Sequence, residues 1–255
     1  MSQTLLRLEN VGKLFYIYKA QKTLFRLASS LARRIPVYQT LWALKEISLE
    51  VKKGEKIALV GRNGAGKTTL FRVACGIYHA TEGRVVRSAA LKPLFRYGTG
   101  MNPHLAVIDN IYLLGAFYGL SVREVDARLE EILAFSELEK FLYLPVKNLS
   151  AGQVGRLCFS VFIQGRDNFF AFDETTALAD LGFQKKMSEY FKRMMRSPEK
   201  TVLMAAHNLE ELKTHCQRAV WLEAGRVRMD GPCEEVVAAY RASCGDFSGP
   251  ASTLS

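Results

Sequence analysis

A glycine-rich octet that follows an apolar run is the feature that most limits what this chain can fold into. The run 56–60 is almost continuously apolar, which is typical of a strand buried on both faces of a sheet. The octet fits the pattern GxxxxGK followed by Ser or Thr, and it consists of Gly61, Arg62, Asn63, Gly64, Ala65, Gly66, Lys67 and Thr68. A run compatible with a helix begins at Thr69, so the octet joins a strand to a helix.

The chemistry of this octet suits the phosphates of a nucleotide. Glycines let backbone N–H groups turn inward around phosphate oxygens at the start of the following helix. Lys67 would place its charge on the β- and γ-phosphates, and the Thr68 hydroxyl would be a ligand for Mg²⁺. A glycine-rich turn with a chance lysine is the alternative. The flanking strand and helix favour nucleotide binding by the octet together with Thr69.

A second apolar run ends in two acids. Residues 168–172 are followed directly by Asp173 and Glu174. At the carboxyl end of a parallel strand, the first acid can hold Mg²⁺ through water and the second can orient an attacking water. Two acids after a strand are as often a solvated turn. The phosphate-binding octet elsewhere in the chain favours the catalytic interpretation.

Strands and helices alternate along the rest of the chain, which predicts an α/β fold with a mainly parallel sheet. Further elements are expected as strands at 5–11, 47–51 and 201–205, a hairpin of 219–223 with 226–229, and a helix at 183–196. Ser121 and Glu124 match a capping box, which predicts the start of another helix. That helix would carry one apolar stripe, formed by Val122, Val125, Leu129, Ile132 and Leu133.

Two further motifs accompany the octet and the acid pair. Leu149-Ser150-Ala151-Gly152-Gln153 lies between the octet and the acid pair, and Ala205-Ala206-His207-Asn208 follows them. In this order the motifs resemble those of the ATP-binding cassette (ABC) ATPases, over roughly residues 5–240. The resemblance implies a P-loop NTPase cassette over residues 1–240, with a RecA-like core, an antiparallel β subdomain and a helical subdomain at about 100–165. Residues 241–255 are then a flexible tail.

The same resemblance assigns roles to particular residues. ATP and Mg²⁺ are the implied cofactors, with Lys67 and Thr68 as the Walker A pair and Asp173 holding the shell of Mg²⁺. The remaining roles are a general base at Glu174, a switch histidine at His207, a D-loop acid at Asp180, and signature residues at Ser150, Gly152 and Gln153. In this family the signature grips the γ-phosphate bound to the other subunit. A chain with one cassette therefore implies a head-to-tail homodimer.

The connecting sequence resembles one subfamily, which exports capsular polysaccharide, O-antigen or teichoic acid through a separate membrane permease. The segments that carry this resemblance are 42–48, 61–67, 109–113, 144–147, 231–232 and 234–240. The implied function is an ATP-hydrolysing subunit that powers export of a lipid-linked polysaccharide across the bacterial inner membrane. A cassette for another exported cargo, such as a drug or lipid, is an alternative. A soluble ABC ATPase without a permease is a further alternative, and it usually needs two fused cassettes or a long coiled-coil insertion.

Three positions depart from the family pattern or leave a choice open. Ala151 stands where the signature usually has Gly, and one methyl group is expected to do little harm. Arg96 falls at the Q-loop position, where Gln or Glu usually couples Mg²⁺ to the permease contact. Because a guanidinium cannot ligate a cation, we expect altered or partner-dependent ATPase activity. Phe15 is the expected stacking surface for adenine, with Tyr16 and Trp42 as alternatives.

The formal charge of +10 is concentrated in two windows that contain no acid, between Glu9 and Glu46 and between Glu82 and Asp109. Within the first window, residues 19–35 have the spacing of an amphipathic helix that ends before Pro36. The inserted segment 19–40 would lie on an anionic membrane, on a permease, or simply on the cassette with its charges in water. We expect no nucleic-acid partner, because no recognisable module accompanies the charge.

The beginning of the sequence and its hydropathy bear on where the protein works. Residues 1–10 contain Arg7 and Glu9 and have no apolar core of a signal peptide. No run of 18 apolar residues occurs, so no membrane-spanning helix is predicted. We therefore expect a peripheral protein on the cytoplasmic face of the bacterial inner membrane.

Overall fold

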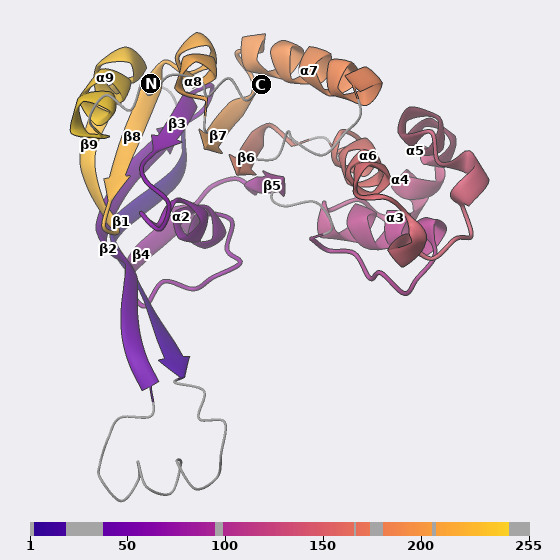
Figure 1. Ribbon diagram of the computed structural model, residues 1–255, viewed down its shortest axis with the longest axis horizontal. Helices are drawn as coiled ribbons and strands as arrows, with labels where there is room; N and C mark the ends of the chain where they lie inside the picture. The colour runs from indigo at the N-terminus through magenta and orange to yellow at the C-terminus, as the bar shows by residue number, and fades with distance from the viewer. Residues whose placement is uncertain are drawn as a thin grey trace, which may run out of the picture. The chain divides into compact units, whose positions relative to one another are not determined.

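The computed structural model describes most of the chain, which divides into two compact units (Figure 1). The described residues are 3–18, 38–94, 99–165, 167–173, 181–205 and 208–244. The first unit comprises Met1–Lys52, Leu59–Ser88 and Arg218–Ser255, and the second comprises Lys53–Ala58 and Ala89–Gln217.

The first unit contains an antiparallel sheet in the order β2-β1-β4. Its strands are β1 (Thr4–Tyr18), β2 (Tyr38–Lys52) and β4 (Glu82–Arg87). Alternate apolar side chains of β1 and β2 are buried, and this half-buried pattern is what a strand with one covered face requires. The antiparallel subdomain expected from the sequence is thus present.

The strands β1 and β2 are both longer than the sequence predicts. Their distal parts pair with each other as far as Tyr18 opposite Tyr38, and the rings of Tyr16 and Tyr38 meet edge to face at 5.4 Å. Side chains of this ribbon are largely exposed, so no alternation of apolar and polar residues marks it in the sequence. Residues 38–40, which the sequence assigns to the inserted segment 19–40, belong to β2. Residues 19–37 lie outside the described residues.

The predicted hairpin is confirmed in the first unit as β8 (Arg218–Glu223) and β9 (Arg226–Pro232). The turn residues Ala224 and Gly225 both have positive φ, 47° and 79°, as a two-residue hairpin loop requires. Helix α9 (Cys233–Cys244) follows and packs Tyr240 against Trp221 at 5.6 Å between ring centroids. The helix extends past the expected cassette boundary at residue 240, as far as Cys244.

The predicted parallel strands follow the order β5-β6-β7-β3. They are β5 (Lys92–Leu94), β6 (Phe169–Asp173), β7 (Thr201–Ala205) and β3 (Lys56–Val60). The first three of these strands and Lys56–Ala58 of β3 belong to the second unit. Each of the predicted runs 56–60, 168–172 and 201–205 is confirmed to within one residue. Helix α7 (Leu181–Arg196) joins β6 to β7 in sequence and presses Phe191 against Phe172 at 4.9 Å, and α8 (Leu209–His215) follows β7.

Helices α3 to α6 gather as a separate group within the second unit (Figure 1). They are α3 (Val107–Phe117), α4 (Val122–Asp126), α5 (Leu129–Ser136) and α6 (Ala151–Phe162), with short 3-10 turns η1 (Glu139–Phe141) and η2 (Val146–Asn148). All of them fall inside the stretch 100–165 for which the sequence predicts a helical subdomain.

The capping box at Ser121 is confirmed, but the single stripe behind it is wrong. Ser121 accepts a hydrogen bond from the Glu124 backbone N–H at 3.3 Å, and its own N–H donates to the Glu124 carboxylate at 3.0 Å. The helix then divides into α4 and α5, because Arg128 leaves helical geometry and its guanidinium donates to the carbonyl of Glu124 at 2.9 Å. Val122 is consequently 65% exposed, whereas Val125 and Ile132 are buried.

Within the described part of the chain, none of the helices combines the length and the apolar character needed to span a bilayer.

Candidate nucleotide-binding and signature sites

The phosphate-binding octet begins directly after β3 and runs into the first turn of α2 (Lys67–Ala74), and its residues belong to the first unit. Three of its residues have positive φ: Gly61 at 149°, Gly64 at 81° and Gly66 at 108°. Only glycine adopts such angles without a steric cost, so the backbone path explains the three glycines. The path ends at Gly66, which is the N-cap of α2.

Two of these glycines are also required by close backbone approach. A Cβ atom on Gly61 would overlap the carbonyl oxygen of Leu222, and one on Gly66 would lie 2.7 Å from the carbonyl oxygen of Ala43. A Cβ on Gly64 would meet no heavy atom of the described residues within 4 Å. Gly64 is therefore constrained by its φ alone.

The turn of the β8–β9 hairpin contacts the octet through its backbone. The Gly225 N–H donates to the Ala65 carbonyl at 3.1 Å, and the Lys45 N–H donates to the Gly225 carbonyl at 2.8 Å. A Cβ atom on Gly225 would lie 2.7 Å from the Ala43 carbonyl oxygen. Sequence reasoning identified this turn but missed its link to the octet, because the contact joins residues far apart in the chain.

The Lys67 side chain bonds back to the beginning of the octet. Its ammonium donates to the Gly61 carbonyl at 2.6 Å and approaches the Arg62 carbonyl at 3.3 Å. The charge is thus held at the two carbonyls that begin the octet. Thr68 and Thr69 follow in the first turn of that helix. A cation, a helix N-terminus and a left-handed loop are features with which proteins commonly bind phosphate oxygens.

Phe15, the expected adenine platform, belongs to an aromatic and basic cluster next to α2. Its ring meets Tyr78 edge to face at 5.5 Å, and the Lys13 ammonium lies 5.3 Å from the centre of the Phe15 ring. Arg72 of α2 donates to the Tyr78 hydroxyl at 2.8 Å. These contacts connect Phe15 to the helix that begins with Lys67. The sequence did not indicate Tyr78 or Arg72 as site residues, because neither belongs to a recognisable motif.

The two alternative aromatic residues have different surroundings. Tyr16 is 60% exposed and packs on Tyr38 in the distal ribbon. Trp42 is half-buried, and a Cβ atom on Gly12 would lie 2.9 Å from its ring. Tight packing against Gly12 favours a structural role for Trp42, and the cluster around Phe15 keeps Phe15 as the preferred candidate.

In the second unit, Asp173 is the last residue of β6, as the sequence predicts. It lies opposite Ala205 in the parallel register with β7, and it is half-buried, whereas the four preceding residues of β6 are buried. Asn208 caps α8 by accepting hydrogen bonds from the N–H groups of Glu210 and Glu211. Four predicted site residues lie outside the described residues: Arg96, Glu174, Asp180 and His207.

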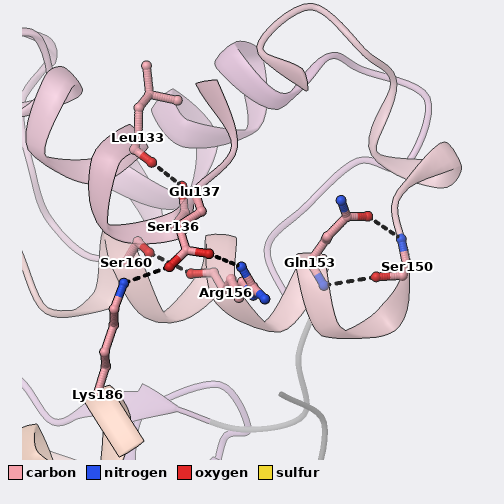
Figure 2. A network of polar contacts seen from close by, with 8 residues as sticks. All are labelled: Leu133, Ser136, Glu137, Ser150, Gln153, Arg156, Ser160 and Lys186. Atoms are coloured by element: carbon pink, nitrogen blue, oxygen red, sulfur yellow. Dashed lines mark hydrogen bonds and ion pairs between the residues drawn. The ribbon is translucent and has the colours of Figure 1, made fainter. Parts of the chain in front are cut away.

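The signature motif forms the capped start of α6 (Figure 2). Ser150 is the N-cap: its hydroxyl oxygen accepts from the Gln153 N–H at 3.2 Å, and its own N–H donates to the Gln153 amide oxygen at 2.8 Å. The serine hydroxyl keeps its own proton for donation to an anion. Ala151 and Gly152 occupy the first helical positions, where an alanine fits standard helix geometry.

The residues expected to hold Mg²⁺ have suitable chemistry. The hydroxyl of Thr68 and the carboxylate of Asp173 are hard oxygen donors, and Mg²⁺ usually takes one or two such protein ligands together with water and substrate phosphates. Within the described ranges, no group of three or more His, Cys, Asp or Glu residues forms a metal cage. Each of these two oxygen donors, taken by itself, is of the kind that Mg²⁺ accepts from a protein.

A left-handed phosphate loop on a parallel strand, a second strand ending in an acid, and a separate capped signature helix define a class of protein, the ATP-binding cassette. Residues 44–177 match the family model described as ABC transporter. The chain belongs to the ABC transporter family and forms its ATP-binding domain.

Several curated bacterial proteins are similar to this chain in sequence over most of its length. It is 36% identical over 240 residues to the ABC transporter protein AbcA of Aeromonas salmonicida, which covers 94% of this chain and 77% of the relative. It is also 36% identical to an O-antigen export system ATP-binding protein RfbB of Klebsiella pneumoniae, over 78% of this chain and 80% of the relative. A teichoic acids export ATP-binding protein TagH of Levilactobacillus brevis is 32% identical, over 96% and 66% respectively.

Solved structures confirm the cassette fold. A dimeric post-hydrolysis structure of the ATP-binding cassette MJ0796, bound to ADP and Pi, matches with a TM-score of 0.67 at 22% identity, over 90% of this chain and 99% of that one. The structure of cbiO1 from Clostridium perfringens matches with a TM-score of 0.60 at 21% identity, over 94% and 93%. At these identities the likeness shows the fold.

Proposed function

We propose that this chain is the ATP-hydrolysing subunit of a bacterial exporter of lipid-linked polysaccharide, working with a separate permease. The observation that carries the proposal is the combination of a complete phosphate loop and a capped signature helix in a chain 36% identical to an O-antigen export ATP-binding protein. A cassette for another exported cargo is the second candidate, because the relatives also include an ABC transporter protein whose name gives no cargo.

In the proposed mechanism, the octet and Thr69 bind the phosphates of ATP, and Lys67 places its ammonium on the β- and γ-phosphates. Phe15 stacks on the adenine. Thr68 and Asp173 would hold Mg²⁺, which supplies positive charge to the phosphoryl oxygens during transfer. Glu174 accepts a proton from the attacking water, and His207 contacts the γ-phosphate.

Hydrolysis needs two copies of the chain in this proposal. Ser150, Gly152 and Gln153 of one copy complete the γ-phosphate site of the other, and Asp180 lies at the shared interface. The two cassettes close on ATP and reopen after hydrolysis. The permease converts this movement into transport. The Ser150 hydroxyl supports this role, since it caps α6 and can still donate a hydrogen bond to an anion.

The permease partner implies a peripheral location at the cytoplasmic face of the inner membrane. The basic segment 19–40 and the Q-loop position Arg96 are proposed to face that side, where anionic lipid or the permease would meet them. Reversing Lys22, Arg26 and Arg33 to Glu should reduce membrane association. Replacing Arg96 by Gln should change the ATPase rate of the isolated dimer, and an unchanged rate would count against a role for Arg96.

The proposal is tested by purifying the chain alone and together with a candidate permease, chosen from the genes that neighbour its own. We expect Mg²⁺-dependent ATP hydrolysis that Lys67→Ala abolishes, copurification from solubilised membranes, and loss of a surface polysaccharide when the gene carries Lys67→Ala. Hydrolysis and copurification with intact surface polysaccharide would favour another cargo. Absence of both would contradict a transport function.

A further inference from the structure

Glu137, which terminates α5, has an unfavourable backbone conformation. Its φ and ψ are 59° and 38°, in the left-handed region, and its N–H donates to the Leu133 carbonyl at 2.8 Å (Figure 2). Glycine or asparagine usually occupies this helix-terminating position, because other side chains pay about 1 kcal/mol there. Because this conformation is unfavourable for glutamate, contacts of the Glu137 side chain are expected to compensate for it.

The carboxylate of Glu137 joins two other helices. One oxygen accepts from the Arg156 guanidinium of α6 at 2.6 Å, and the other accepts from the Lys186 ammonium of α7 at 2.7 Å (Figure 2). These two cations hold the pKa of Glu137 below its ordinary value, the Lys186 hydrogen bond contributing most. A single side chain therefore links α5, α6 and α7.

Aromatic rings hold both cations in place. The Arg156 guanidinium carbon lies 5.6 Å from the centre of the Phe183 ring of α7, and the Lys186 ammonium lies 5.6 Å from that of Phe135 in α5. Phe135 and Phe183 themselves meet edge to face at 5.5 Å. Each cation thus contacts an aromatic ring on a neighbouring helix, which restricts its rotamers and makes the junction more rigid than an isolated surface ion pair.

The two helices joined in this way bear on the proposed reaction. Helix α6 begins with the Ser150 capping box, and Arg156 lies in its second turn. Helix α7 begins at Leu181, directly after the Asp180 position in the sequence, and Lys186 lies in its second turn. A displacement of α6 relative to α7 would move the signature end away from the geometry needed for the partner's γ-phosphate.

We propose that Glu137 is a positioning residue that makes α6 and α7 move as one body when two cassettes close on ATP. This inference rests on the proposed function, because it assumes closure around the γ-phosphate. Glu137 acts through Arg156 and Lys186, and it has no contact with nucleotide in this proposal. Its loss should impair the closed state and leave the first binding of ATP to the phosphate loop unchanged.

The first test is Glu137→Gln, which removes the charge with little change of shape. We expect kcat for ATP to fall about tenfold while KM stays within about twofold, since the loss falls on the closed state. Glu137→Asp should recover part of the rate, because it restores the charge and Asp tolerates the left-handed region better than most residues.

The second test is Glu137→Gly, which separates positioning from folding. Glycine relieves the backbone strain, so the melting temperature should stay within about 2 °C of the wild type or rise. The rate should nevertheless fall as far as in Glu137→Gln. The matched control is Glu199→Gln, which removes another exposed ion pair of the second unit, with Lys53 at 2.6 Å, and should leave the rate unchanged.

Wild-type kcat in both Glu137→Gln and Glu137→Gly would overturn the inference, as would a raised KM with unchanged kcat. An inactive wild-type protein would instead count against the proposed function. In that event, hydrogen exchange decides the positioning role: Glu137→Gln should speed exchange in α6 and in the first turns of α7 without affecting α2. Unchanged exchange in α6 and α7 would overturn it.

Discussion

The phosphate loop and the signature motif both begin a helix, and both are suited to phosphate oxygens, but they are built in different ways. The phosphate loop depends on the backbone: Gly61, Gly64 and Gly66 have positive φ, and two of them press against other backbone segments. The signature depends on side chains, since Ser150 and Gln153 satisfy each other's N–H groups. A position in close contact with other backbone, such as Gly61 or Gly66, admits no extra atom, whereas a regular helical position after a side-chain cap does.

This difference explains why the sequence keeps the phosphate-loop pattern in full and departs from the signature pattern at Ala151. A methyl group at residue 151 projects from an ordinary helical position, and alanine is the best helix former. A methyl group at residue 61 would enter the space of the Leu222 carbonyl. Substitutions in the two motifs should therefore have effects of different size.

The largest effect is expected from Gly61→Ala. The new Cβ would overlap the Leu222 carbonyl oxygen and would also require an alanine at a φ of 149°. We expect a loss of about 3 kcal/mol or more in the free energy of unfolding and no measurable ATP binding. Chemical denaturation and binding of a fluorescent ATP analogue would check this. Normal binding would mean that the loop moves aside easily, contrary to the close packing described above.

The next effect is expected from Ser150→Ala. Removing the N-cap should cost about 1 kcal/mol in stability. The rate of ATP hydrolysis should fall about tenfold or more, because the hydroxyl is proposed to contact the partner's γ-phosphate. ATPase rates and denaturant titrations measure the two effects separately. Equal stability loss without a rate loss would show that Ser150 is only a helix cap.

A smaller effect is expected from Gly64→Ala, which serves as the matched partner of Gly61→Ala. A Cβ on residue 64 meets open space among the described residues, so only the φ of 81° is unfavourable. The expected loss is about 1 kcal/mol, with nucleotide affinity reduced less than by Gly61→Ala. If the two variants behaved alike, the clash with Leu222 would not be the cause of the larger effect.

The smallest effect is expected from Ala151→Gly, which restores the usual signature residue. Glycine in the first turn of α6 should lower stability by up to about 1 kcal/mol. ATP hydrolysis should stay within about twofold of the wild type, because the methyl group is not part of the capping box. A large gain in rate would show that Ala151 restrains the signature.

Features that depend on near neighbours in the chain were predicted well. The strand, loop and helix around Gly61–Thr68, the capping box at Ser121 and the turn at Ala224–Gly225 all follow from residues within a few positions of each other. The extent of β1 and β2 was not predicted, because their distal ribbon buries too little to leave a hydrophobic pattern. The apolar stripe from Val122 was wrong, because a single side chain, Arg128, caps α4 and ends it early.

The sequence by itself determined the family, the phosphate loop and the acid that ends β6, whereas the Ser150 cap of α6 became visible only in the structure. Their signals are local: glycines that permit positive φ next to an apolar run, and a second apolar run that ends directly in an acid. Only the tertiary structure showed that Gly225 supports the phosphate loop, that Tyr78 and Arg72 connect Phe15 to α2, and that Glu137 joins α6 to α7. These contacts join residues that are distant in the chain, so the types and spacing of neighbouring residues do not predict them.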